Sequence, residues 1–469
     1  MRSSTRVAQV SQTAKTNQIT PRAVRMSPYG EPVEPGRAGM ISTNRIVQAS
    51  SGCTLIDCTI PSRAHSAPLT STSRNLKRRL LNIPGTILSM RIAILAEVPW
   101  PTGAAGSVRV RRWAEELSRA GCEVTVIPVG HFGSKDATDI DQEFHTATAA
   151  RFTSKFGVLG RGGWSSLTRI AEALRLAKPD WILCYGRRVS TLAACVARRP
   201  RGTRIAIDVT EHPSITLWER GYGSAVGWDH WLGARHLLRK ADAVFTITPN
   251  LAAVCQPWTS APIAVVPGMI QGVPAIASFA TSNTRKFGYF GSWHTKDAPS
   301  FIIGMATRMV MNDPCATFET VGFIPQAVLT ALMDAGLDSP RTIHHGSVSD
   351  ERLSAVLSSW DLALMPRSDA KSARFAFPNR AADLLGCGVP VVVRKSVGIA
   401  SLGADSGVIL VPSDDAKQAA DIASTILSNK ARLAEFRSAA RHGAQMNLSA
   451  ARAIGRAISI MRQVQSEAS

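Results

Sequence analysis

The chain has 469 residues, of which 45% are hydrophobic and 19% are charged. This composition is ordinary for a globular protein, and it excludes a wholly disordered chain and a collagen-like repeat. The 54 Lys and Arg residues outnumber the 34 Asp and Glu residues by 20 charges. Such an excess is typical of proteins that bind nucleic acid, an anionic membrane or phosphorylated substrates.

The first 89 residues carry almost half of this excess, with 12 basic and 3 acidic side chains. They are rich in Ser, Thr, Arg and Pro and lack a sustained helical or strand period, so we expect residues 1–89 to be disordered. Two interpretations stay open: an organelle transit peptide, or an overextended gene start whose native initiator is Met90, which we favour. The remaining basic residues are dispersed, and no groove-reading or base-stacking motif occurs, so we expect no nucleic-acid partner.

From Met90 onward, short apolar runs alternate with amphipathic helical patterns, which is typical of parallel sheets covered by helices. A helix is predicted over 108–120, because Gly121 stands at its C-terminal end. We expect strands in the first half at 92–95, 124–129, 181–184, 205–209, 243–247 and 264–266.

The pattern restarts after 267–283, which is polar, small and rich in Pro and Gly, and which we expect to link two domains. Strands are predicted at 287–291, 317–321, 342–344, 362–365, 389–393 and 407–411, and helices at 416–427, 430–442 and 450–464. We therefore predict two doubly wound α/β domains, 90–270 and 284–445, facing a cleft. The last helix, 446–469, is expected to cross back to the first domain. Ligands of such domains bind where the strand order reverses.

The run 377–392 carries the clearest functional signal. Asp383 falls in a predicted helix, where its carboxylate can accept both hydroxyls of a ribose, and Arg380, one turn earlier, can offer two N–H groups to a diphosphate. Gly386 and Gly388 then let the chain turn sharply into a buried strand. The run resembles the donor-site signature of GT-B glycosyltransferases, in particular the retaining family four (group 1) enzymes: Pro-x-Lys-x-x-Glu before Gly-x-Pro-Val-Val.

The resemblance covers about residues 90–465, with supporting stretches at 121–126, 179–182, 241–244, 265–268, 288–292 and 345–348. It implies two Rossmann-like domains, the first for the acceptor and the second for a nucleotide sugar. The implied reaction is a retaining, metal-independent transfer of a hexosyl unit to a hydroxyl of a glycan or lipid-linked acceptor, in polysaccharide or glycoconjugate biosynthesis. The resemblance implies no cofactor and no metal, and it implies little acid–base help, because the leaving phosphate itself can deprotonate the acceptor hydroxyl.

The resemblance also names site residues, with departures from the family pattern. Phe375 stands where many members have a Glu, and Ser292 replaces the usual diphosphate Arg, which leaves Lys296 as the nearest cation. Thr210 takes the slot of a family His, so its neighbours Glu211 and His212 are the catalytic candidates. The remaining candidates are Gly291, Gly346, Arg380 and Asp383 with Ser292 and Lys296 for the donor, and Gly103 and Gly106 for the acceptor or a phosphate.

Residues 151–178 mix aromatic and basic side chains, a composition suited to an anionic bilayer. We expect a cytoplasmic protein. For this segment two interpretations stay open: peripheral contact with the inner face of the plasma membrane, or a solvated loop and helix.

Two other functions stay open. A sugar-nucleotide 2-epimerase of the same architecture would need acid and base carboxylates at the sugar, and Phe375 argues against it. A non-catalytic binding protein that kept the fold is the second alternative, because the usual Glu and Arg are missing.

Overall fold

The computed structural model describes residues 89–100, 105–130, 145–146, 150–151, 163–186, 188–189, 196, 198–270, 284–368, 370–395, 398–412 and 414–467. They belong to one compact unit, Ile83–Ser469. Of the extension predicted to be disordered, all but Ser89 lies outside the described residues.

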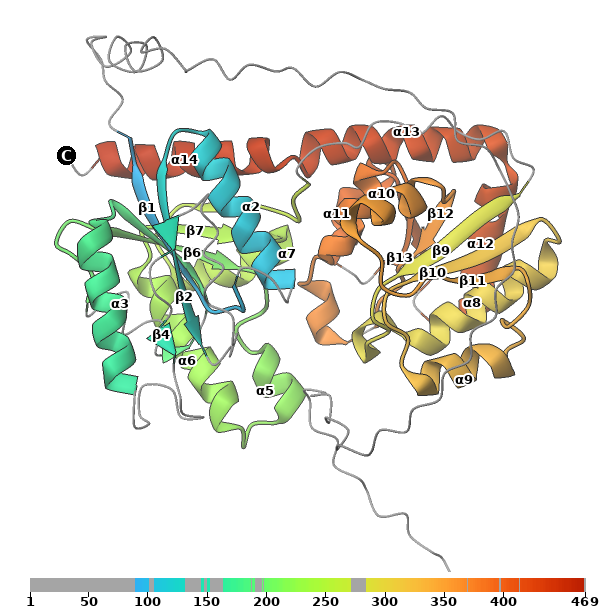
Figure 1. The fold of residues 1–469 in the computed structure, drawn as a ribbon, viewed down its shortest axis with the longest axis horizontal. Coiled ribbons are helices and arrows are strands. Elements are labelled where there is room, and N and C mark those ends of the chain that lie inside the picture. The colour runs from blue at the N-terminus through green and yellow to red at the C-terminus, as the bar shows by residue number, and fades with distance from the viewer. Residues whose placement is uncertain are drawn as a thin grey trace, which may run out of the picture. The chain divides into compact units, whose positions relative to one another are not determined.

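The first half is a parallel sheet in the order β3-β2-β1-β5-β6-β7-β8, with β4 beside β2 (Figure 1). Because β2 follows β1 on one side and β5 lies on the other, the strand order reverses between β1 and β5. The strands are β1 (Arg91–Ala96), β2 (Glu123–Gly130), β3 (His145–Thr146), β4 (Ala150–Arg151), β5 (Trp181–Tyr185), β6 (Arg204–Val209), β7 (Ala243–Thr246) and β8 (Ile263–Val265). The helices are α2 (Ala105–Arg119), α3 (Gly163–Ala177), α5 (Ile215–Arg220), α6 (Ala225–Lys240) and α7 (Pro249–Cys255), with a 3₁₀ turn, η3 (Gln256–Trp258).

The second half is a parallel sheet in the order β11-β10-β9-β12-β13-β14, which reverses between β9 and β12. Its strands are β9 (Arg285–Phe290), β10 (Ala316–Val321), β11 (Thr342–His344), β12 (Leu362–Leu364), β13 (Val391–Arg394) and β14 (Val408–Val411). The helices are α8 (Pro299–Asn312), α9 (Gln326–Asp334), α10 (Asp350–Ser358), α11 (Asn379–Gly386), α12 (Ala416–Ser428), α13 (Lys430–Asn447) and α14 (Ala450–Ser466). The 3₁₀ turns are η4 (Thr295–Asp297), η5 (Lys371–Arg374), η6 (Gly398–Leu402) and η7 (Ala404–Ser406).

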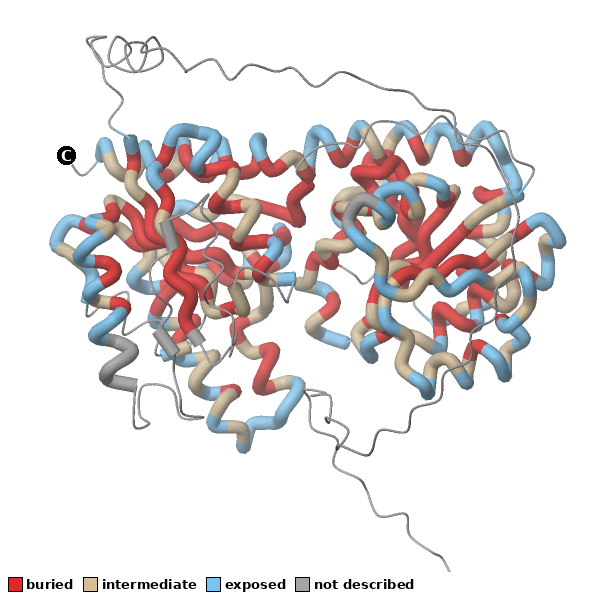
Figure 2. Tube along the Cα trace, in the orientation of Figure 1, coloured by how far each residue is buried: buried red, intermediate tan, exposed pale blue. Residues whose placement is uncertain are grey.

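The central strands of each half are buried, the edge strands β8 and β11 are partly exposed, and the helices expose their outer faces (Figure 2). Strands covered by helices on both faces read as continuous apolar runs, and such runs are the sequence signal that predicted them. The two doubly wound domains predicted from the sequence are confirmed, and the twelve predicted strands lie within two residues of observed ones.

The final helix, α14, packs against the first sheet although it follows the second domain in the chain. Its buried side chains, including Ile454 and Met461, share a core cluster with Ile92 and Trp113, and α14 contacts α2, β7 and β8. Ile270 reinforces this crossing, because its N–H donates to the carbonyl of Leu448 and its carbonyl accepts from Ala450.

The beginning of the predicted linker packs into the first half. Residues 267–270 are buried rather than exposed, with Met269 1% and Ile270 5% accessible. The Pro267 carbonyl accepts a hydrogen bond from buried Arg109. The polar composition of 267–283 hid this, because the apolar pair at 269–270 is too short to show a period. Residues 271–283 lie outside the described part of the chain.

A buried ion pair fastens α2 to the first sheet. Arg109 donates through Nε and Nη2 to both carboxylate oxygens of Asp208, at 2.7 and 2.8 Å. The same guanidinium also donates to the carbonyls of Val266 and Pro267, and Trp113 Nε1 donates to Asp208 at 2.8 Å. Burial alone would lower the pKa of Arg109, but Asp208 raises it above its ordinary value, so the pair stays ionised.

Replacing Asp208 by Ala should lower the free energy of unfolding by about 3–5 kcal/mol, because Arg109 would remain buried without its counter-charge. Urea denaturation followed by circular dichroism measures this. Asp421→Ala is the matched control, because it breaks an Arg–Asp pair, Arg308 with Asp421, on an exposed surface, where the change should be much smaller. Equal stability losses in the two variants would contradict the role of the buried pair.

Candidate functional site

The carboxyl edge of the second sheet is tied together by three glycines. Gly291 N–H donates to the Val321 carbonyl at 2.9 Å, and Gly322 N–H donates to the Gly346 carbonyl at 2.8 Å. A Cβ on Gly291 would lie 1.3 Å from Arg380 Nη1, so only glycine lets the guanidinium pass over this loop. The structure therefore brings three predicted donor residues, Gly291, Gly346 and Arg380, to one edge.

Arg380 is fixed by the protein itself. Its Nη1 donates to the Phe290 carbonyl at 2.6 Å and to Tyr289 Oη at 3.2 Å. Its Nη2 donates to both oxygens of Asp297, at 2.8 and 3.0 Å. Arg367 Nη1 donates to the same carboxylate at 2.8 Å. We call Asp297, Arg367, Arg380 and Tyr289 the arginine cluster.

The arginine cluster carries a net positive charge. Asp297 is 2% accessible, and burial alone would raise the pKa of its carboxyl, but Arg380 and Arg367 bring that pKa below its ordinary value. Burial is the main cause that raises the pKa of Tyr289 to about 12. The Tyr289 hydroxyl therefore stays neutral, and it donates to Asp297 at 2.8 Å. Two guanidinium groups thus face one carboxylate, which leaves one positive charge.

Neither Asp297 nor Arg367 was predicted as a site residue. Both follow the two strands between which the order of the second sheet reverses: Asp297 lies seven residues after β9, and Arg367 lies three residues after β12. A charged residue just after each of two predicted strands was the available signal. The strand order that makes those two positions neighbours was not available from the sequence.

Backbone strain gathers around the arginine cluster. Four described non-glycine residues have a positive φ, and three of them are Trp293 at 56°, Ala298 at 55° and Arg367 at 60°. Ala298 directly follows Asp297, and Trp293 N–H donates to Tyr289 Oη at 3.1 Å. Such conformations cost free energy and concentrate at ligand sites.

Asp383, the predicted ribose ligand, is paired with a residue of the first half. Arg112 of α2 donates through Nη2 to Asp383 Oδ1 at 3.0 Å, and the side chains are 14% and 32% accessible. Nearby, Asn379 Nδ2 donates to the Ala105 carbonyl at 3.4 Å. The contact was missed from sequence, because 271 residues separate Arg112 from Asp383.

His212, a predicted catalytic residue, lies in an aromatic contact with Phe375. Their ring centroids are 4.7 Å apart, and Trp218 stacks on His212 at 4.2 Å. Burial lowers the pKa of His212 to about 4. Its Nδ1 accepts the Ser214 N–H at 3.1 Å, so the neutral ring carries its hydrogen on Nε2. At neutral pH His212 can therefore donate a hydrogen bond through Nε2, and it holds no free base nitrogen.

Phe375 itself is held in place by its own backbone. Its carbonyl accepts from Thr248 Oγ1 at 3.1 Å, and the carbonyl of Arg374 accepts from Asn250 Nδ2 at 2.8 Å. The residue that replaces the family Glu thus lies between the two halves, where its ring supplies packing rather than charge.

The other predicted residues are placed less centrally. Lys296 pairs with Glu219 of α5 at 3.0 Å, with both side chains more than 40% accessible. Ser292 and Glu211 are half-buried. Gly106 lies in α2, where a Cβ would come within 2.6 Å of Val98, and Gly103 lies outside the described residues.

The reversal point of the first sheet also carries an arginine that the sequence analysis missed. Arg188 follows β5 by three residues and pairs with Glu97, which follows β1. Its Nε lies 3.3 Å from His230 Nε2. Both halves therefore place an arginine at the same topological position, Arg188 in the first and Arg367 in the second.

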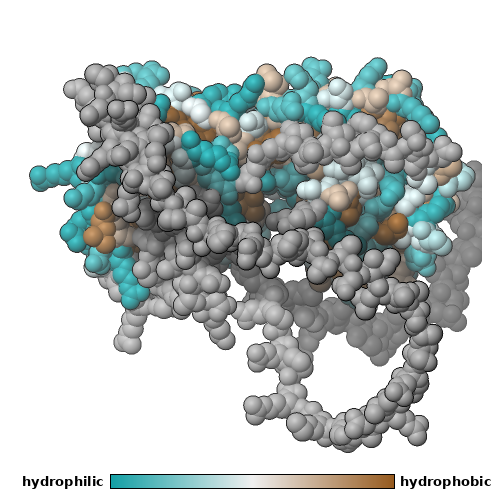
Figure 3. Space-filling view, turned by 45° about the horizontal axis from the view of Figure 1, so that its top comes forward, coloured by the Kyte–Doolittle hydropathy of each residue, from teal (hydrophilic) through white to brown (hydrophobic). Residues whose placement is uncertain are grey.

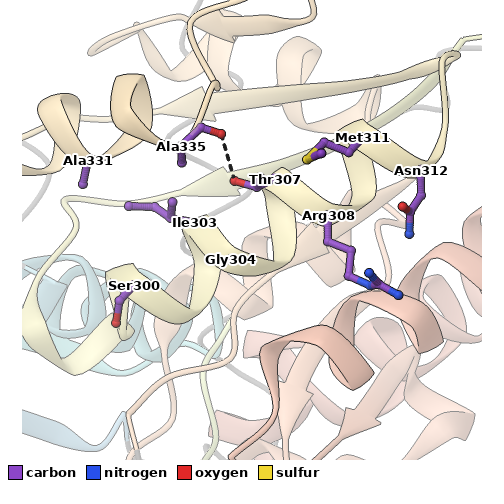
Figure 4. Close-up of a pocket in the computed structure, with 9 residues that line it drawn as sticks. All are labelled: Ser300, Ile303, Gly304, Thr307, Arg308, Met311, Asn312, Ala331 and Ala335. Carbon is purple, nitrogen blue, oxygen red and sulfur yellow. Dashed lines mark hydrogen bonds between the residues drawn. The ribbon is translucent and has the colours of Figure 1, made fainter.

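A cavity of about 500 Å³ lies elsewhere, between α8 and α9 (Figure 4). Apolar side chains such as Ile303 and Met311 line it, and Thr307 Oγ1 donates to the Ala335 carbonyl at 3.5 Å. Arg308 is its charged lining residue, but Nε and Nη2 already bind Asp421. None of the predicted site residues lines this cavity, and it offers no polar cluster for a nucleotide.

The visible described surface mixes hydrophilic residues with small, separated hydrophobic groups (Figure 3). Within the described ranges, no helix is both long enough and apolar enough to cross a bilayer. Nor do three or more His, Cys, Asp or Glu side chains gather there as metal ligands.

Comparisons with known proteins agree with this arrangement. A glycosyl transferase 4-like domain matches residues 105–269, and a glycosyl transferases group 1 domain matches residues 284–429. Together these two matches cover about two thirds of the chain, and the second begins where the second sheet begins. No curated protein sequence matches the chain at a significant level.

Solved structures share the fold at low sequence identity. Sucrose-phosphate synthase from Thermosynechococcus elongatus is 16% identical with a TM-score of 0.62, covering 81% of this chain and 100% of that one. Anabaena HepE in complex with UDP is 16% identical with a TM-score of 0.59, covering 81% and 99%. WaaG, a glycosyltransferase involved in lipopolysaccharide biosynthesis, is 14% identical with a TM-score of 0.58, covering 80% and 98%. With two matched domains in family order and this fold, the chain belongs to the group 1 glycosyltransferases of the GT-B class.

Proposed function

We propose that the protein transfers a hexosyl unit from a nucleotide diphosphate sugar to a hydroxyl of a glycan or lipid-linked acceptor, with retention of configuration. The observation that carries this proposal is the position of Arg380 and Asp383 on α11, beside the point where the strand order of the second sheet reverses. A carboxylate suits a ribose diol and a positively charged cluster suits a diphosphate. Helix α11 therefore brings the carboxylate and one member of the cluster, Arg380, to the same edge of the sheet.

The rate enhancement would come from stabilisation of the leaving group. Breaking the bond between the sugar and the diphosphate leaves negative charge on the phosphate oxygens, and the net positive arginine cluster stabilises that charge. A fixed group costs no reorganisation during the reaction, and Asp297 holds the Arg380 guanidinium in place through two hydrogen bonds.

Proton transfer would not use His212. Its Nδ1 is occupied by the Ser214 N–H, and its Nε2 carries the hydrogen. His212 would therefore donate a hydrogen bond to an oxygen of the bound sugar, and the departing phosphate would take the proton of the acceptor hydroxyl. An inverting transfer would need a separate general base, a role that this proposal does not give to His212.

The acceptor would bind the first domain at its strand reversal, near Arg188 and Glu97. We also propose a cytoplasmic enzyme in glycan or glycoconjugate biosynthesis that contacts an anionic membrane peripherally through the segment 151–178. Arg169, Arg175 and Leu176 on the exposed face of α3 support this contact.

Two alternatives remain testable. A 2-epimerase would convert a nucleotide sugar without any acceptor, and Phe375 packed on His212 offers it no second carboxylate. A non-catalytic binding protein would bind a nucleotide without turnover. Incubating UDP-glucose without and with acceptor extracts, then analysing nucleotide and sugar by mass spectrometry, separates the three functions.

Asp383→Ala should weaken binding of a nucleoside diphosphate about 10- to 100-fold, because hydrogen bonds from the ribose hydroxyls to a charged carboxylate are lost. Isothermal titration with UDP, GDP and ADP measures the effect. Arg112→Ala is the matched control, since it breaks the pair with Asp383 yet keeps the carboxylate. The proposal fails if the wild-type protein binds none of the three nucleotides, or if Asp383→Ala binds as tightly as wild type.

Removing divalent metal ions should leave turnover unchanged, because guanidinium groups rather than a metal would neutralise the diphosphate. The measurement is nucleoside diphosphate release after EDTA treatment, with and without added Mg²⁺ or Mn²⁺. A loss of activity that either metal restores would contradict metal-independent transfer.

Stability should fall with acid partly because of His212. The unfolded chain binds a proton at this residue near pH 6.5, whereas the folded protein does so only near pH 4. The folded state therefore loses stability as pH falls from about 6.5 towards 4, and His212→Gln should reduce that loss. Melting temperatures across this range measure it, with exposed His236→Gln as the control. An imidazole NMR signal of His212 that titrates near pH 6.5 would contradict the assignment.

A further inference from the structure

Arg367 and Arg380 share Asp297 but differ in how much of their hydrogen-bonding capacity the protein uses. Arg380 engages both terminal nitrogens, with Phe290, Tyr289 and Asp297 as acceptors. Arg367 donates to Asp297 through Nη1. Its Nε is buried and has no hydrogen-bond partner among the described residues. Buried donors are normally paired, so Arg367 has capacity left for an acceptor from outside the chain.

The geometry permits Arg367 to exchange partners. If its guanidinium turned towards a ligand, Asp297 would keep two hydrogen bonds from Arg380 Nη2 and one from Tyr289 Oη. The buried carboxylate would therefore stay compensated. In the exchange, Arg367 loses one charge-assisted hydrogen bond to the Asp297 carboxylate. It forms at least one such bond with a phosphate group of the ligand.

The surrounding backbone also favours an anion. Ala298 and Pro378 stand at the N-termini of α8 and α11, and neither provides a side-chain cap. In contrast, Ser349, Asp415, Asn429 and Ser449 cap their helices through side chains. Uncapped N–H groups add positive potential beside the arginine cluster.

The backbone of Arg367 is strained. Its φ of 60° lies in the left-handed region, which a long side chain adopts only when the fold requires it. Arg367 follows β12, and β12 is the neighbour of β9 at the point where the strand order reverses. Doubly wound sheets bind their ligands in the crevice at this point.

We propose that Arg367 binds the diphosphate of the donor nucleotide and supplies the guanidinium that the family pattern places at position 292, here Ser292. Arg380 is then a positioning residue that holds Asp297 and the loop after β9. This inference rests on the proposed function, since it names the diphosphate ligand of the same site.

The test compares Arg367→Gln and Arg367→Lys with the wild-type protein by isothermal titration. UDP and GDP probe the diphosphate, and UMP and GMP probe the same nucleosides without the second phosphate. Arg367→Gln should weaken diphosphate binding about 10- to 100-fold and monophosphate binding much less. Arg367→Lys should recover part of the loss, because it keeps the charge but not the planar fork.

Arg308→Gln is the control, since it removes an arginine from a solvent-exposed Arg–Asp pair between α8 and α12, and its nucleotide affinity should match wild type. The inference is overturned if Arg367→Gln binds diphosphates as wild type does, or weakens diphosphates and monophosphates equally, which a structural role would produce. If Arg367→Gln does not fold, Arg367→Lys provides the test, by its loss of diphosphate affinity compared with its loss of monophosphate affinity. Absence of nucleotide binding in the wild-type protein overturns the proposed function itself, which distinguishes the two failures.

Discussion

The donor edge of the second domain depends on the Asp297 carboxylate. Two arginines meet at this edge, and without a counter-charge their mutual repulsion and desolvation would keep them apart. Asp297 accepts from both and from Tyr289, so one buried group fixes the loop after β9, the loop after β12 and the start of α11. The net positive charge that remains is what makes this edge suitable for a diphosphate.

A second buried charge pair stabilises the first domain. Arg109 and Asp208 lock α2 against β6 and against the segment that follows β8. This fixes the helix that carries Arg112, which reaches Asp383 of the donor domain. Helix α2 therefore carries both the buried arginine of this pair and the arginine that contacts α11. Helix α14 adds further apolar packing to α2.

The departures from the family pattern have physical counterparts in the structure. Phe375 replaces a carboxylate and packs on His212, which burial keeps neutral. Ser292 replaces an arginine, and Arg367 brings a guanidinium to the same edge from a different strand. The charge missing at Ser292 is thus present at Arg367. This argues against the alternative of a binding protein that has lost the ability to hold the donor diphosphate.

The sequence by itself determined the strands, the two doubly wound domains and the donor motif at 377–392, because apolar runs and helical spacing are local properties. Gly291, Gly346 and Arg380 were also found locally, by motif. Only the tertiary structure decided which charges meet: Arg367 lies 70 residues from Asp297, and Arg112 lies 271 residues from Asp383. The tertiary structure also buries residues 267–270, although the composition of 267–283 is that of a linker. Strand order and domain contact set these pairings, and no periodicity in the chain encodes either.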